Sequence, residues 1–153
     1  MKSQQVIAAA KHDHWSVVRG KHGDAPFIFR YREGLCDVTD FTGYSQMLVV
    51  TWTYSDDGCT GIPNQDETSE LEDFEDRLVR SFEHDFHAVL TCVTTERGTR
   101  RWVFYTSDLS ECERRINQVP QKSERYPVEL IAKSDPDWSY LHDTIQTICS
   151  GAA

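Results

Sequence analysis

The stretch that decides the fold is MLVVTWTY, which runs from Met47 to Tyr54. It consists of β-branched and aromatic residues, and its apolar side chains fall on both faces of an extended chain instead of alternating with polar ones. Such a run predicts a strand at the centre of a sheet that is buried on both faces. Two layers of the protein must therefore cover that sheet, one on each side.

The elements that follow this strand predict an α+β fold. They are a helix from between Asp66 and Ser69 to about Glu83, strands from Ala88 to Thr95 and from Arg100 to Thr106, a helix from Asp108 to Pro120, a strand from Tyr126 to Ala132 and a final helix. The order β-α-β-β-α-β is that of a ferredoxin-like split β-α-β core. In that core, residues 47–54 lie between the last strand and residues 100–106.

A β-hairpin is predicted before this core and an extra helix after it. Two β-prone runs, Trp15 to Arg19 and Pro26 to Arg32, flank the turn signal Lys21-His22-Gly23-Asp24. The C-terminal helix is predicted to begin with Asp135 as its N-cap and Pro136 as its first residue. Either the hairpin or this helix could cover the second face of the sheet, and the sequence does not decide between them.

Domain organisation follows from length and polarity. Residues 1–13 are polar and lack a regular period, so they are predicted to lie loosely on the surface. Residues 14–149 are predicted to form a single α+β domain, because 153 residues is an ordinary domain length. Residues 33–46 and 55–65 contain many Gly, Asp, Thr and Ser residues and are predicted to be loops.

The composition indicates a globular protein without a disulfide framework. Apolar residues make up 39% of the chain, and the five cysteines are widely spaced with no Cys-x-x-Cys pair. No stretch approaches the roughly 20 apolar residues of a membrane span, which predicts a cytoplasmic protein. No nucleophile, phosphate-binding or metal-ligand motif stands out, so no catalytic residue, metal or cofactor is assigned.

Charge is strongly segregated along the chain. The net charge is -9, and the segment from Glu33 to Asp76 contains twelve acidic residues and no Lys or Arg. Such a segment repels phosphate backbones and favours a protein partner with a basic surface. The acidic residues predicted to contact that partner are Asp37, Asp40, Asp56, Asp57, Asp66, Glu67 and Glu70.

Glu75 departs from the pattern of its own helix. At about 100° per residue, Leu71, Phe74 and Leu78 mark an apolar sector, and Glu75 falls inside it. A carboxylate that faces the core must be hydrogen-bonded, paired with an arginine or neutralised. Glu75 is therefore predicted to be partly buried and paired with an arginine, the alternative being a helix edge where it reaches solvent.

Five short motifs resemble the bacterial family called domain of unknown function 695. They are Gly61-x-Pro63, Glu72-Asp73-Phe74-Glu75-Asp76-x-Leu78, Gly98-x-Arg100-x-Trp102-x-Phe104-Tyr105, Tyr126-Pro127-x-Glu129-Leu130 and Asp135-Pro136-x-Trp138. The family brings no catalytic residues with it. Its members look like relatives of the regulator of ribonuclease activity B, an acidic protein that inhibits a ribonuclease by binding it. The resemblance therefore implies a regulatory or binding module.

Three functional hypotheses follow. The leading one is a non-catalytic module that binds a basic partner, for example as an inhibitor of a nuclease or an immunity protein against a toxin. The second is an enzyme with Asp56, Asp57 or Glu75 as acid or base in a cleft between loops 33–46 and 55–65. The third is RNA binding by the open sheet, which requires Trp102 or Tyr105 to be exposed.

Overall fold

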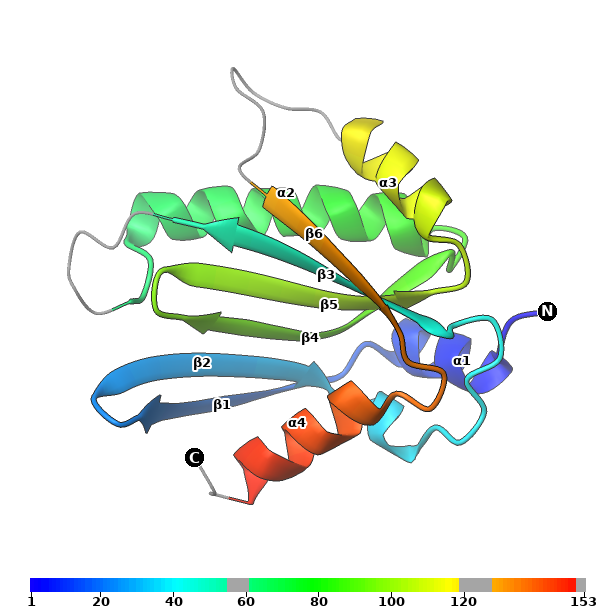
Figure 1. Ribbon diagram of the computed structural model, residues 1–153, viewed down its shortest axis with the longest axis horizontal. Helices are drawn as coiled ribbons and strands as arrows, with labels where there is room; N and C mark the ends of the chain where they lie inside the picture. Colours follow the sequence, from blue (N-terminus) through cyan, green and yellow to red (C-terminus); the bar gives the residue numbers. More distant parts are fainter. Residues whose placement is uncertain (55–60, 119–127, 151–153) are drawn as a thin grey trace.

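A six-stranded antiparallel sheet forms the centre of the structure, a computed structural model that describes residues 1–54, 61–118 and 128–150 (Figure 1). The strand order is β1-β2-β4-β5-β3-β6. The strands are β1 (Trp15–His22), β2 (Ala25–Arg32), β3 (Gln46–Thr53), β4 (Ala88–Glu96), β5 (Thr99–Thr106) and β6 (Val128–Ser134). As its two-sided apolar pattern predicts, β3 lies inside the sheet, with β5 on one side and β6 on the other.

The predicted N-terminal hairpin is confirmed, and β4 and β5 form a second hairpin. Gly23 and Asp24 connect β1 to β2, and Gly23 has a φ of 64°. Arg97 and Gly98 connect β4 to β5, with φ values of 50° and 81°. Two successive residues with positive φ match a type I′ turn, whose twist suits two-residue hairpins.

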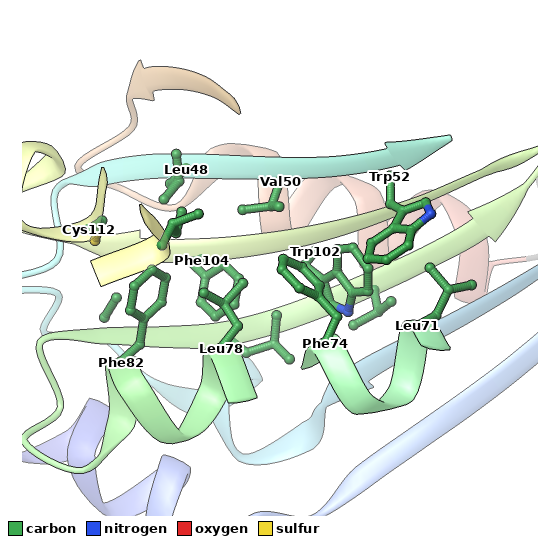
Figure 2. Close-up of a cluster of buried hydrophobic side chains, with 14 of the residues drawn as sticks. Leu48, Val50, Trp52, Leu71, Phe74, Leu78, Phe82, Trp102, Phe104 and Cys112 are labelled. Atoms are coloured by element: carbon green, nitrogen blue, oxygen red, sulfur yellow. The ribbon is translucent and has the colours of Figure 1, made fainter. Parts of the chain in front are cut away.

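Two helices cover one face of the sheet: α2 (Gln65–Glu83) and α3 (Leu109–Gln118). The apolar side chains of α2 point toward the strands and pack on Trp102 and Phe104 (Figure 2). The four that are fully buried are Leu71, Phe74, Leu78 and Phe82. The helix starts one residue before the predicted range because Asn64 caps it in a capping box with Glu67.

The second face is covered by elements from three parts of the chain. They are α1 (Gln4–His12), the short 3-10 helix η1 (Glu33–Asp37) with the loop after it, and α4 (Ser139–Cys149). The prediction that residues 1–13 lie loosely on the surface is wrong. The side chain of Ser3 caps α1, and Val6 and Ala10, one turn apart, are buried in the core of this face.

The start of α4 also differs from the prediction. The helix begins at Ser139, and the residue before it, Trp138, has a left-handed backbone with a φ of 57°. Asp135 still caps the helix, because its carboxylate accepts hydrogen bonds from the backbone amides of Ser139 and Tyr140, both at 3.0 Å. The cap therefore acts from four residues before the helix starts, while the buried Trp138 side chain enters the core.

The strand β6 is one edge of the sheet and pairs only with β3. Most of its residues are exposed, including Leu130 at 39% and Ile131 at 59%. It was predicted to begin at Tyr126, which lies outside the described residues, as does the helix-ending Pro120.

Candidate functional site

The described residues that precede and follow β3 lie at opposite ends of this strand (Figure 1). Residues 38–45 precede this strand and residues 61–64 follow it, and eight extended residues span about 26 Å. Asp37 and Asp40 therefore stand far from the acidic residues at the start of α2. The cleft expected between loops 33–46 and 55–65 involves residues 55–60, including Asp56 and Asp57, which lie outside the described residues.

The predicted contact residues differ in how they are used locally. The Asp40 carboxylate accepts hydrogen bonds from the Thr42 amide at 3.1 Å and hydroxyl at 2.6 Å, and these hold the pKa of Asp40 below its usual range. Glu67 serves in the capping box of α2. Asp66 and Glu70 are exposed and form no ion pair with a described residue. Asp37 is likewise exposed and forms no ion pair with a described residue, so these three carboxylates of the predicted set are free at the surface.

A groove lies between the β1–β2 hairpin and α2. It consists of two adjoining cavities with volumes of about 440 and 480 Å3. Arg30, Glu75 and Asp76 line both of them. This charged groove brings together side chains from β2, α2 and β5, and it is the candidate functional site.

Glu75 lies at the centre of the charged groove. Its side chain is only 17% exposed and forms an ion pair with Arg30 of β2, which is the arginine expected beside it. The same oxygen, Oε1, accepts a hydrogen bond from Nε1 of the buried Trp102 at 2.8 Å. The carboxylate thus ties α2 to strands on both sides of β4.

Arg32 closes one end of the charged groove, and its side chain is 4% exposed. Its Nη1 and Nη2 atoms bind the two Glu83 oxygens at 3.0 and 2.9 Å, and Nε and Nη2 bind Asp13 at 3.1 and 2.9 Å. Nη1 also donates to the Leu90 carbonyl at 3.0 Å. All five N–H donors of the guanidinium are used. The Trp15 ring lies 5.1 Å from this guanidinium and 5.2 Å from that of Arg30.

Arg100 lies toward the other end of the charged groove and is 9% exposed. Its Nε donates to the Thr95 hydroxyl at 2.7 Å, and it forms no ion pair with a described carboxylate. Burial and the nearby positive charge of Arg30 lower the pKa of Arg100. Gly61 sits close by against the β4–β5 turn, where a Cβ atom would come within 2.6 Å of the Arg97 nitrogen.

Sequence reasoning identified Glu75 but missed the buried arginines. The sequence does contain an indication of them, because successive side chains of a strand point to opposite faces and residues two apart share a face. Arg30 and Arg32 share one face of β2, and Arg100 shares a face of β5 with Trp102, which packs against α2. An arginine at such a position faces the helix layer and needs an anionic partner there.

Acid is expected to weaken the Asp13–Arg32 contact. Burial raises the pKa of Asp13, but the hydrogen bonds from Arg32 and Trp15 outweigh it and leave that pKa below its ordinary 3.8. A lowered folded-state pKa gives stability that is present above the unfolded value and is lost as pH falls. We therefore expect the difference in free energy of unfolding between wild type and Asp13→Asn to shrink from pH 6 to pH 3, measured by denaturant titration. A difference that stays constant with pH would contradict this.

The surface required for RNA binding by the sheet is not available in the described chain. Trp102 and Tyr105 are both fully buried, one under each helical layer. Among the described residues, no three His, Cys, Asp or Glu side chains are grouped so that they could hold a metal ion. No described helix combines the length and the apolar character needed to cross a membrane.

Comparison with known proteins identifies the family of the chain from its sequence. No curated protein and no solved structure matches it significantly. A family model does match, over residues 13–145, and it is described as a family of unknown function (DUF695). This match covers the hairpin, the charged groove and most of α4, and it agrees with the motifs quoted above. The chain belongs to the DUF695 family.

Proposed function

We propose that this protein is a non-catalytic binding module that uses the acidic first half of α2 to engage a basic surface of a partner protein. The observation that carries the proposal is the set of exposed carboxylates that form no ion pair with a described residue: Asp66, Glu70 and Glu72. They lie within about three turns of one helix. Opposite charge on a partner would speed association and orient the complex.

The second half of α2 is less negative, which limits the proposed surface to the start of the helix. Arg77 pairs with Asp73 at 3.2 Å, and Arg80 follows one turn later. Asp37 and Asp40 are left out of the surface because they lie at the other end of β3. The proposed contact is therefore a compact helical patch and not a joined pair of loops.

We infer that β3, α2, β4, β5, α3 and β6 form a ferredoxin-like split β-α-β core. The sheet order supports this, since α2 connects two strands that flank β5 and α3 connects two strands that flank β3. The likeness to the regulator of ribonuclease activity B supports a nuclease as one kind of basic partner, by analogy alone. An immunity protein against a toxin would use the same charge.

An enzyme that uses Glu75 as acid or base is the second candidate. The cavity of about 440 Å3 beside the Glu75 carboxylate favours an enzyme, because it could hold a small substrate. Against an acid or base role, Oε1 of Glu75 already accepts hydrogen bonds from both Arg30 and Trp102. These contacts hold the carboxylate in a structural role, so the binding module is the better supported function.

The test compares two triple variants with the same change in net charge. Asp66→Asn/Glu70→Gln/Glu72→Gln removes charge from the proposed surface, and Glu113→Gln/Asp137→Asn/Asp143→Asn removes it from exposed sites on other elements. We expect a partner captured from cell extract, then purified, to bind wild type and the control alike. The surface variant should bind at least about tenfold more weakly, a difference of roughly 1.4 kcal/mol.

Salt provides the second readout. Binding to wild type should weaken between about 50 and 300 mM salt, because exposed charges are screened over that range. A purified partner that binds the surface variant as tightly as wild type, or whose affinity is unchanged by salt, would refute the proposed surface.

A further inference from the structure

We propose that the cavity around Arg100, at one end of the charged groove, binds a small molecule through a carboxylate or phosphate group. The anion would bind Arg100, which is not part of the acidic surface of α2, although Glu72 of that surface also lines the cavity. The proposal does not depend on the proposed partner. The proposal starts from one buried cation whose charge no described side chain neutralises.

Arg100 and Arg32 make an informative contrast. Both are buried, with relative exposures of 9% and 3%. Arg32 uses all five N–H donors on Glu83, Asp13 and a carbonyl, whereas the recorded contact of Arg100 is the single bond from Nε to the Thr95 hydroxyl. A buried charge is expensive unless it is paired and hydrogen-bonded. The terminal amino groups of Arg100 are thus available to an anion.

The nearest acidic residue in the charged groove does not fill this role. Glu75 acts electrostatically on Arg100, but its Oε1 binds Arg30 and Trp102. No carboxylate oxygen of the described chain lies within 4.0 Å of a guanidinium nitrogen of Arg100. An incoming anion would also offset the burial and the repulsion from Arg30 that lower the pKa of Arg100.

The cavity has the form of a small-molecule site. Its volume of about 480 Å3 lies within the range of roughly 300–1,000 Å3 that is typical of ligand pockets. Two further arginines and an apolar wall surround Arg100. They are Arg19, Arg30, Val17, Ile28 and Ile62. A planar guanidinium suits a carboxylate or phosphate in a two-point contact, and the apolar wall suits a short hydrocarbon portion beside it.

Two acidic residues restrict what can enter. Glu72 and Asp76 also line the cavity, and both are exposed. They would repel a nucleic-acid backbone or another extended polyanion. The cavity therefore favours a small ligand with one anionic group, which agrees with the acidic character of the whole chain.

The test follows Arg100 directly by NMR. Sodium phosphate and sodium propionate are added in turn to 15N-labelled protein, at constant ionic strength set with sodium chloride. We expect at least one of them to give a saturable shift of the Arg100 Nε–Hε signal and of the Val17 and Ile28 amides, with a Kd of about 1–10 mM. A response to phosphate alone assigns the site to phosphate groups, and a response to propionate alone assigns it to carboxylates.

Variants separate this site from general charge effects. Arg100→Gln should abolish the saturable shift of the Val17 and Ile28 amides, whereas Arg101→Gln, on the opposite face of β5, should keep it. Arg100→Lys keeps the charge but not the planar fork, so it should bind at least about threefold more weakly than wild type even if Arg100→Gln fails to fold. No saturable shift in wild type, or equal affinity in wild type and Arg100→Lys, would overturn the proposal.

Discussion

Arg32→Met is expected to lower the free energy of unfolding by about 3–5 kcal/mol, because it removes one partner of a buried ion pair. The Glu83 carboxylate, whose side chain is 11% exposed, would lose both hydrogen bonds from the guanidinium and keep only the one from the Leu90 amide, at 2.8 Å. Methionine fills similar volume, so the loss reports charge and hydrogen bonding more than a cavity. Urea unfolding at pH 7 measures it.

Two controls define this expectation. Arg114→Met removes an arginine whose side chain is 55% exposed and pairs with Glu111, and solvent screens such a surface pair, so this loss should be much smaller than that of Arg32→Met. The double variant Arg32→Met/Glu83→Gln should be more stable than Arg32→Met, since a neutral amide is easier to bury than an unpaired carboxylate. A loss below about 1 kcal/mol for Arg32→Met would show that the pair is not essential for stability.

Trp138→Ala is expected to lower the free energy of unfolding by about 3–5 kcal/mol, the usual result of truncating a fully buried tryptophan. The Trp138 ring stacks on Tyr105 at 4.4 Å and on Phe41 at 4.8 Å between ring centres. Its Nε1 donates to the Tyr44 carbonyl at 2.8 Å. This one side chain therefore holds both α4 and the loop before β3 on the second face of the sheet.

Hydrogen exchange should locate the effect of Trp138→Ala. The amides of α4 and of residues 38–45 should lose protection more than those of α2, which lies on the other face. Tyr140→Ala provides the matched control, because its side chain is 38% exposed and its loss should cost less than about 1 kcal/mol. Equal loss of protection in α2 and α4 would contradict a separate role for this anchor.

The strands and helices with a long apolar pattern can be predicted from the sequence, because that pattern shows which face of the element is buried. The apolar run in β3 and the stripe of Leu71, Phe74 and Leu78 in α2 each repeat long enough to reveal which face is buried. Turn residues with positive φ mark both hairpins, because glycine is nearly free of strain there. These signals are local, so a single sequence contains them.

The covering of the second face lacks such a signal. The nine-residue helix α1 buries only Val6 and Ala10, which is too few positions to show a helical period. Tyr44 is fully buried in a segment that is neither helix nor strand, so no period exists to predict it. Burial at these positions depends on contacts between segments distant in sequence, and those contacts are fixed only by the complete fold.

The charged groove could be predicted only in part: the need of Glu75 for a partner could be predicted, and the identity of that partner could not. The helical position of Glu75 shows that it needs a partner, yet Arg30 is 45 residues away in sequence. Pairings over such distances are set by the sheet order, which brings β2 next to β4 and below α2. Asp37 and the acidic residues at the start of α2 lie far apart for the converse reason. Residues close in sequence, on either side of β3, are separated by the length of that strand.

The internal position of β3 also determines when it can fold during synthesis. Both of its neighbours come later in the chain, since β5 ends about fifty residues after β3 and β6 follows still later. At roughly 5–20 residues per second, the ribosome leaves β3 without a pairing partner for about 3–10 seconds. During that time its β-branched and aromatic side chains form the kind of segment that associates with other unfolded chains. The strand that organises the finished sheet is thus the part of the nascent chain most in need of protection from aggregation.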